Sequence, residues 1–556
     1  MKRFFALILT LVMLLGLAAC HREDAPPTES TVHTAQPSTD TPDGTNIKTF
    51  TVGTTAQIEK AVRGEYAFDM LASGVSELPL IRQDTEGNFH PLLASFTTED
   101  SQTWTFTVTE GLKWSDGAPV TAEDILYTLQ YEDRTEGAAN FVSQTDEGGK
   151  TTEARFSGYA LSEDKMQLSL VLTTPNVRFL STVTTLRILP MHLYFGKTDV
   201  TEAEARVTCG PYVLESFNRD AGTLTFRVNA LYPQKPNVET IVYRIFGNED
   251  TMYLALQHGD IDMVWNYSSG VAATYQELLA GLDTVKLMAV SATNAPAVLA
   301  FNNAKGLFAD EKLRLAVSYA LDYTAFGTYF GSANADLPNR GFVPGTTVGY
   351  KPTDKLEYNE AVAQDYMRAA GYTKNSAGFY EKEGKECAFV LTVNASKTTH
   401  VALAELVKTQ LERFGIRVGL DAVDKDSYNA KTSNKFSQNN ITMEAAIYGF
   451  TAAGMGMGSG LGSIYVDGSH NVQGGCQVFD DEFTAILGQM REATTPDAYS
   501  AAAGRLQDYY AAHCPLIALY WDQLILAYSS NYENLTADAT FGLNCAANWF
   551  SITAKS

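Results

Sequence analysis

Alternating and helically spaced apolar positions define the elements that this chain is expected to form. Thr103–Val108 alternates apolar with hydroxyl side chains, which predicts a strand buried on one face. Further strands are predicted at Met166–Thr173, Thr223–Val228 and Thr240–Phe246. Thr121–Asp124 has the spacing of a capping box, which predicts a helix start there. The first half of the chain is therefore mixed and rich in strands.

Helical spacing dominates the second half. Apolar residues recur at i, i+3 and i+4 through Leu403–Phe414, and Gly415 is placed to end that helix. The run Ile416–Val423 predicts a strand directly after it. Asp310 and Asn359 are placed as N-caps of two other helices. Helix followed by strand is typical of an α/β region.

The first twenty residues predict export and a lipid anchor. Lys2 and Arg3 precede the apolar run Phe4–Leu15, which is too short for a membrane span and fits an export signal. The following Leu17–Cys20 resembles the bacterial lipobox, in which the cysteine is acylated and the signal is cut before it. We therefore expect residues 1–20 to be a lipoprotein signal peptide and Cys20 to carry the lipid. An ordinary secretory signal with a chance cysteine is the alternative.

His21–Lys48 is expected to be a disordered tether. This stretch is rich in Thr, Pro, Ser, Asp and Glu and has few large apolar residues. Such a composition cannot bury enough apolar surface to fold. The folded body is then held near the membrane but remains free to reorient.

Charge and composition exclude several classes of protein. The 556 residues carry 41 basic and 64 acidic side chains, a formal charge of −23, which argues against nucleic acid as a partner. The content of 45% hydrophobic and 19% charged residues is that of a globular protein. A mean hydropathy of −0.12 excludes a polytopic membrane transporter.

Sequence signatures of catalytic and metal sites are missing. There is no HExxH, GxSxG, Walker A loop or GxGxxG after a strand, and no CxxC pair. We therefore predict no catalytic residues, no metal site and no cofactor. The remaining cysteines are expected to be buried small side chains, although one disulfide is possible in an exported protein; they are Cys209, Cys387, Cys476, Cys514 and Cys545.

Eleven segments, taken in order, resemble the signature of extracytoplasmic solute-binding proteins of the peptide/nickel type. These are the oligopeptide- and dipeptide-binding receptors of ABC importers. The resemblance covers about residues 50–556. The segments are His90–Phe96, Trp104–Phe106, Leu112–Asp124, Cys209–Leu214, Gly259–Val264, Ala300–Asn303, Phe308–Asp310, Arg314–Ala320, Tyr358–Ala361, Ala370–Tyr372 and Pro515–Tyr520. We interpret these residues as structural: Trp104, Phe106 and Trp114 as core or turn residues, and Arg314 as a partner in a buried pair.

The resemblance implies an α/β, two-lobed periplasmic-binding-protein-like (type II) fold with an extra subdomain inserted in the first lobe. Lobe I would comprise residues 49–302 plus 517–556, with the subdomain at about 82–186. Lobe III would comprise residues 303–516. The hinge is expected where lobe I is left and re-entered, at Phe301, Asn302, Asn303, Leu516, Ile517 and Tyr520.

The function implied is capture of a solute between the lobes and its delivery to an importer. The expected partners are a peptide or other small solute, ABC permease and ATPase subunits, and the membrane through the lipid anchor. The protein is expected to be a monomer at the extracytoplasmic face of a bacterial cell membrane. Ligand contacts are expected from Tyr66, Trp265, Tyr267, Phe450, Thr451 and Asn471, chosen by aligned position and by aromatic or polar character.

One departure from the family pattern concerns the peptide amine. The family places an aspartate for the α-amino group after a Gly-Trp pair, but here Gly449–Gly454 has Phe450 in place of Trp and Ala453 near the expected acid. Asp467 or Asp480 could supply the carboxylate, or the ligand could lack a free amine. The loop Gly454–Gly462 carries two methionines and is interpreted as a mobile loop, or alternatively as an adaptable lip for an apolar or metal-chelate ligand.

Other functions remain open at this point. The same fold could bind a metal chelate, an oligosaccharide or another small solute. A membrane-tethered hydrolase would need a nucleophile–base or metal constellation, which the sequence does not show. A lipoprotein chaperone or adhesin would need no enclosed cleft.

Overall fold

The fold is seen in a computed structural model that describes residues 47–85, 87–145, 151–266, 270–343, 345, 349–432, 440–450, 476–478 and 481–555. For residues 291–296, 449, 450 and 491 only the backbone is described. Several predictions fall outside the described residues. They concern the signal peptide with Cys20, the tether up to residue 46, Ala453 and the methionine loop, and the ligand residues Tyr267, Thr451 and Asn471.

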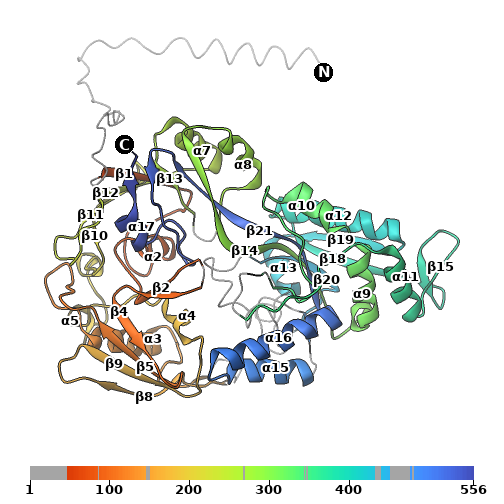
Figure 1. Cartoon of the computed structure of the whole chain (residues 1–556), viewed down its shortest axis with the longest axis horizontal. Coiled ribbons are helices and arrows are strands. Elements are labelled where there is room, and N and C mark those ends of the chain that lie inside the picture. The colour runs from red at the N-terminus through yellow and green to blue at the C-terminus, as the bar shows by residue number, and fades with distance from the viewer. Residues whose placement is uncertain are drawn as a thin grey trace, which may run out of the picture. The chain divides into compact units, whose positions relative to one another are not determined.

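A mixed sheet organises the described residues (Figure 1). Its ten strands lie in the order β10-β11-β12-β1-β13-β21-β14-β20-β18-β19. Their bounds are β1 Ile47–Thr54, β10 Tyr212–Asn218, β11 Thr223–Val228, β12 Val238–Ile245, β13 Met263–Val264, β14 Val285–Phe301, β18 Ala388–Asn394, β19 Arg417–Val423, β20 Ala445–Phe450 and β21 Leu516–Ser529. The predicted strands at 223–228, 240–246 and 416–423 correspond to β11, β12 and β19. Ile47 and Lys48, predicted to end the tether, belong to β1, because Ile47 is buried and pairs with Val238.

The first half of the sheet builds one core, which we call the first core. It includes buried side chains from β1, β12 and β13 and from the ends of β14 and β21, among them Phe50 and Tyr243, together with Trp549 from the C-terminal helix. The helices packed on it are α2 Tyr66–Ala72, α7 Glu249–His258, α8 Ala273–Ala280 and α17 Ala546–Ser551. β1 runs parallel to both β12 and β13, so the carboxyl ends of these strands meet at one edge.

The other half builds the second core, which has two faces. On one face lie η1 Leu307–Ala309, α9 Glu311–Ala320, α10 Tyr323–Phe330, α11 Glu360–Ala369 and α12 Thr398–Phe414. On the other lie α13 Lys425–Thr432, α15 Asp481–Arg491 and α16 Pro496–His513. The predicted caps are confirmed: Asp310 accepts from Lys312 N and Asn359 from Val362 N, and Gly415 ends α12 with φ 115°.

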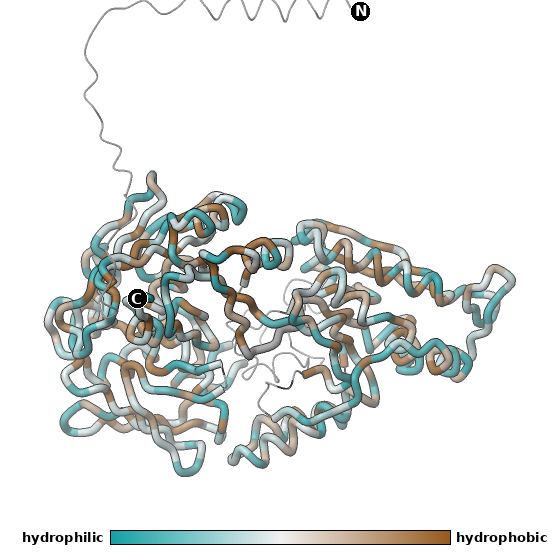
Figure 2. Tube along the Cα trace, turned by 45° about the horizontal axis from the view of Figure 1, so that its top comes forward, coloured by the Kyte–Doolittle hydropathy of each residue, from teal (hydrophilic) through white to brown (hydrophobic). Residues whose placement is uncertain are grey.

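Two long antiparallel strands, β14 and β21, join the two cores (Figure 2). Along β14 the buried side chains belong to the first core up to Val290 and to the second core from Ala297. Along β21 the change lies between Trp521 and Leu524. The strand register also shifts between Ala289 and Thr293 and again between Asn294 and Ala297. The sheet therefore passes from the first core to the second through the paired strands β14 and β21.

The subdomain is a four-stranded sheet covered by helices. Its order is β4-β5-β9-β8, with bounds β4 Ala94–Thr97, β5 Thr103–Val108, β8 Phe156–Leu161 and β9 Gln167–Leu172. Helices α3 Ala122–Thr135 and α4 Phe179–Val183 pack on it. The capping box is confirmed, since Asp124 accepts from Thr121 N at 2.9 Å. Trp104, Phe106 and Trp114 are buried, as predicted for core residues.

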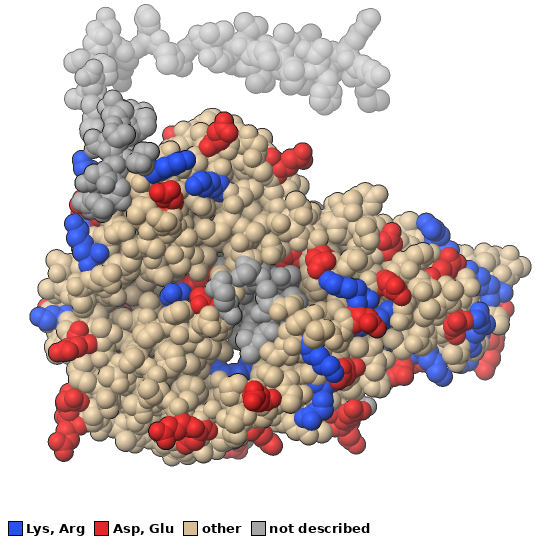
Figure 3. Space-filling model, viewed as in Figure 1, with Lys and Arg blue, Asp and Glu red and all other residues tan. Residues whose placement is uncertain are grey.

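Short elements complete the described chain. They are β2 Ile81–Gln83, β3 Phe89–Pro91, β6 Gln144–Thr145, β7 Thr151–Thr152, β15 Thr373–Lys374, β16 Tyr380–Lys382, β17 Lys385–Glu386, β22 Tyr532–Glu533, β23 Thr553–Ala554, α5 Met191–Tyr194 and α6 Glu202–Ala205. Charged side chains of both signs are spread over the face shown in Figure 3, with acidic groups along the edge that the subdomain occupies.

Arg314 departs from its predicted role in a buried pair. It lies on α9 and is buried, but its guanidinium donates to the backbone carbonyls of Phe308, His513 and Cys514 at 2.7–3.2 Å rather than to a carboxylate. The five cysteines of the described chain, by contrast, are buried and free, as the packing interpretation predicts.

Candidate functional site

The carboxyl ends of β1 and β13 form a polar edge at the first core. Asn266, two residues after β13, accepts hydrogen bonds from the backbone N–H of Thr55 at 2.8 Å and from the hydroxyls of Thr54 and Thr55 at 3.1 and 3.0 Å. Ligands of open α/β sheets bind in crevices at such carboxyl ends. Sequence reasoning missed these three residues, although their positions after two parallel strands carry the signal.

The loop that follows β1 is fixed by a buried ion pair. Arg63 donates to Glu77 at 2.5 Å, to the Tyr194 hydroxyl at 3.3 Å and to the Val207 carbonyl at 3.2 Å. Burial alone would lower the pKa of Arg63, but the facing Glu77 carboxylate outweighs it and raises that pKa above its ordinary value. The loop is therefore held rigidly where it leaves the polar edge.

A second ion pair holds the helix that begins at Tyr66. Asp69 of α2 accepts from Arg187 at 3.1 Å and from the N–H of Gly64 at 3.2 Å. Burial raises the pKa of Asp69, and Arg187 opposes that shift. Tyr66, predicted to contact ligand, is 69% exposed at the start of this anchored helix. This exposed side chain is therefore carried by a helix that is fixed at its start.

The structure brings Trp265 to the same edge but buries it. Its side chain is 5% exposed and its indole N–H donates to the Phe541 carbonyl at 2.8 Å. Phe450 ends β20, where its backbone pairs with Ala295. Ligand contact by Trp265, Tyr66 and Phe450 stays a prediction.

The junction of the two cores carries polar groups on β21. Asp522 accepts from the backbone N–H of Ser332 at 2.8 Å and from its hydroxyl at 2.5 Å. The neighbouring Trp521 exchanges backbone hydrogen bonds with Asp336, both at 3.0 Å. These contacts fasten the loop after α10 to the strand at the point where the cores change.

The subdomain contains a cavity of about 200 Å³. It is lined by Phe106, Phe156, Phe179 and other apolar side chains together with the charged Glu132 and Arg155, and it includes none of the predicted ligand residues. No cluster of three or more His, Cys, Asp or Glu side chains suited to a metal occurs among the residues that the structure describes. Among the helices that the structure describes, none has the length and apolar character to span a membrane.

Known proteins are similar to this chain in sequence and in fold. The family model for bacterial extracellular solute-binding proteins, family 5 (middle part), matches residues 88–466. The nickel-binding periplasmic protein of Escherichia coli K12 is 23% identical over 385 residues, 65% of this chain and 68% of that protein. The oligopeptide-binding protein AppA of Bacillus subtilis 168 is 23% identical over 334 residues, 57% of this chain and 58% of that protein.

Solved structures match over most of the chain. The substrate-binding protein CtaP of Listeria monocytogenes has a TM-score of 0.72 at 16% identity, covering 92% of this chain and all of that one. AppA of Bacillus subtilis in complex with a nonapeptide has a TM-score of 0.67 at 18% identity, again covering 92% and 100%. These likenesses confirm the predicted two-lobed, type II binding-protein fold. With more than half of its length matched by the family model, the chain belongs to the family 5 extracellular solute-binding proteins, the peptide/nickel type.

Proposed function

We propose that this protein is a lipid-anchored, extracytoplasmic receptor of an ABC importer that captures a peptide between its two lobes. Family membership supports a binding role rather than catalysis. The relatives named as oligopeptide-, dipeptide- and murein-peptide-binding proteins support the peptide class. The sequence of residues 1–20 supports the anchor at Cys20. Permease and ATPase subunits are the proposed partners, and the receptor acts as a monomer.

The observation that carries this proposal is the narrow junction between two separately packed cores. β14 and β21 pair along their length and are the strands through which the sheet passes from one core to the other. A solute that touches both lobes stabilises the closed arrangement, because it gains contacts there that the open arrangement lacks.

The hinge is proposed at the register shifts of β14, between Val290 and Ala297, facing Trp521–Leu524 of β21. A strand pair bends most easily where its ladder is interrupted. The crossover residues predicted from the sequence lie beyond this point, inside the second core, where Phe301 and Asn302 are fully buried. Lobe I then ends near residue 290 and resumes near residue 524.

A nickel chelate is the second candidate ligand. The nickel-binding protein of Escherichia coli is among the relatives, and NikZ of Campylobacter jejuni in complex with Ni(L-His) shares the fold with a TM-score of 0.67 at 16% identity. Peptide is preferred because several relatives carry peptide names.

Thermal shift with defined solute pools tests the ligand class. We expect short-peptide pools to raise the melting temperature, and pools of Ni(L-His) complexes and oligosaccharides to leave it unchanged, because binding to the folded state stabilises it. Tyr66→Ala should weaken the shift, whereas Tyr329→Ala, a comparably exposed tyrosine on α10, should not. A shift with Ni(L-His) alone would favour the second candidate, and no shift with any peptide would overturn the first.

A further inference from the structure

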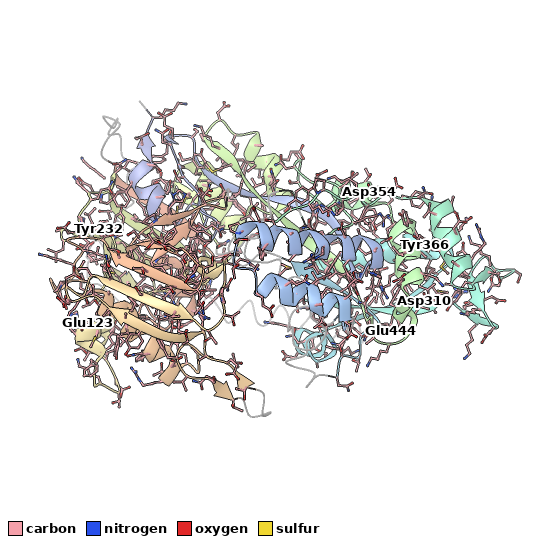
Figure 4. The ribbon with its side chains drawn as sticks, turned by 60° about the horizontal axis from the view of Figure 1, so that its bottom comes forward. Glu123, Tyr232, Asp310, Asp354, Tyr366 and Glu444 are labelled. Carbon is pink, nitrogen blue, oxygen red and sulfur yellow. The ribbon has the colours of Figure 1, made fainter. Side chains whose placement is uncertain are left out.

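The subdomain touches the second core at a point remote from β14 and β21. The Ser101 hydroxyl donates to the Thr494 carbonyl at 2.9 Å, across 393 positions of sequence. The Arg178 guanidinium lies 5.3 Å from the centroid of the Tyr499 ring, and Val177 packs against the second core. Figures 1 and 4 show one end of α16 near the four-stranded sheet of the subdomain.

The subdomain side of this contact is a rigid unit. Ser101 has φ 56°, a left-handed conformation uncommon for a residue other than glycine. Its carbonyl accepts from the Trp104 indole at 3.1 Å and from the N–H of Asn176 at 2.8 Å. Asn176 Oδ1 in turn accepts from Arg178 N at 2.9 Å. Ser101 and residues 176–178 must therefore move together with the sheet.

The opposite side is equally fixed. Thr495 caps α16, and its hydroxyl accepts from Ala498 N at 3.2 Å. Tyr499 N donates to the Thr495 carbonyl at 3.0 Å, which holds the tyrosine in the first turn of the helix. The Tyr499 ring is 2% exposed and belongs to the second core. Each side of the contact is thus fixed to a different hydrophobic core.

The contact combines favourable and unfavourable terms. The apolar packing of Val177 on the second core stabilises the contact, and so does the position of the Arg178 guanidinium over the face of the Tyr499 ring. Against this, Arg178 Nε is buried without a hydrogen-bond partner in the described structure. Unsatisfied buried polar atoms destabilise a contact. A contact balanced in this way can form and separate, unlike one whose polar atoms are all paired.

We propose that Val177 and Arg178 of the subdomain and Tyr499 of α16 form a latch that sets how much of the ligand-free protein is closed. The latch rests on the hinged function proposed above, since the lobes can open at β14 and β21 only if this second contact separates. Apparent affinity scales with the population of the binding-competent state, so the latch adjusts affinity without touching the ligand.

Spin-label distances in the ligand-free protein test the latch. Labels at Glu163→Cys in the subdomain and Ala501→Cys on α16 sit on exposed positions, and the native cysteines of the described chain are buried. Arg178→Ala should lower the ratio of short to long distances by roughly 2- to 30-fold, the range expected for a lost cation–π contact. Independently, Val177→Ser should lower the same ratio, because it removes apolar packing from the contact. Tyr499→Phe, which keeps the ring and with it the cation–π contact, should lower that ratio less than Arg178→Ala does.

Two outcomes separate the latch from the proposed function. If both subdomain variants give the wild-type distance distribution while peptides still raise the melting temperature, the latch is wrong and the receptor function stands. If Arg178→Ala opens the protein but no peptide shifts any variant, the latch stands and the peptide function fails. Cooperative melting of each variant confirms that it is folded.

Discussion

Arg63 and Glu77 face each other in the interior as an ion pair, with a guanidinium nitrogen 2.5 Å from a carboxylate oxygen and both side chains less than 10% exposed. Arg63 also ties the loop after β1 to Tyr194 of α5 and to the Val207 carbonyl. Because neither charge is solvated by water, each is stabilised in the interior by the opposite charge of its partner.

Removing one partner should be costly. Glu77→Gln leaves the buried charge of Arg63 without its carboxylate, and Arg63→Met leaves the buried carboxylate of Glu77 without its guanidinium. For either variant we expect the free energy of unfolding to fall by about 3–5 kcal/mol. Urea denaturation followed by circular dichroism measures it. The double variant Arg63→Met/Glu77→Leu should recover part of the loss.

The exposed pair Arg219–Glu59 is the matched control, with both side chains 65% exposed. Arg219→Met should change stability by less than about 1 kcal/mol, because water already solvates both charges. Equal losses at the two pairs would show that the buried pair has no special role.

Asp538 should make stability fall as pH rises. Burial raises the pKa of Asp538 to about 7, against an unfolded value of about 3.9. Between these values the folded protein holds a proton that the unfolded chain has released, so the stabilisation is complete below pH ~4 and is lost as pH rises to about 7. In this range Asp538 lowers the free energy of unfolding by up to about 1.4 kcal/mol for each unit of rising pH.

Asp538→Asn tests this linkage. The amide oxygen can still accept from the N–H groups of Thr540 and Phe541, as Asp538 Oδ1 does at 2.9 and 2.5 Å. The variant should therefore flatten the dependence of unfolding free energy on pH between 4 and 7. An unchanged slope in denaturation series at several pH values would refute the assignment.

Arg314 should be more important to stability than an ordinary helical arginine. Arg314→Met deprives three buried carbonyls of donors, and we expect a loss of about 2–5 kcal/mol in the free energy of unfolding. Arg505→Met on the exposed face of α16 should stay within about 0.5 kcal/mol. Comparable losses would contradict the role read from the hydrogen bonds.

Cys20→Ala tests the proposed anchor. The acyl chains are proposed to hold the protein at the membrane, so the variant should move to the soluble fraction on cell fractionation. Its melting temperature should equal that of the wild-type body, because the anchor lies outside the fold. Continued membrane association of the variant would count against acylation at this cysteine.

Local features of the fold were predictable from the sequence. The alternation over residues 103–108 is that of β5 with the same bounds, and the capping box at Thr121 and the C-terminal Gly415 both mark real helix ends. These features depend on neighbouring residues alone. The motif resemblance added the two-lobed fold, which no local pattern contains.

Features made by distant residues were not predictable. Arg63 meets Tyr194 across 131 positions, and Asn266 meets Thr55 across 211. The point on β14 where its buried side chains pass from the first core to the second depends on which helices cover each part of the strand. The motif near Phe301 therefore located the strand in the sequence but could not locate that point. Arg314 was expected in an ion pair because a buried arginine needs acceptors, yet backbone carbonyls at a helix end supply them.

The central claim is that the two lobes enclose a solute and release it unaltered. Native mass spectrometry of the protein purified from its own host tests this most directly. We expect a bound species with the mass of a short peptide, freed intact on denaturation. A protein that carries only non-peptide cargo, or that yields a cleaved product from a peptide supplied to it, would refute the proposed receptor function.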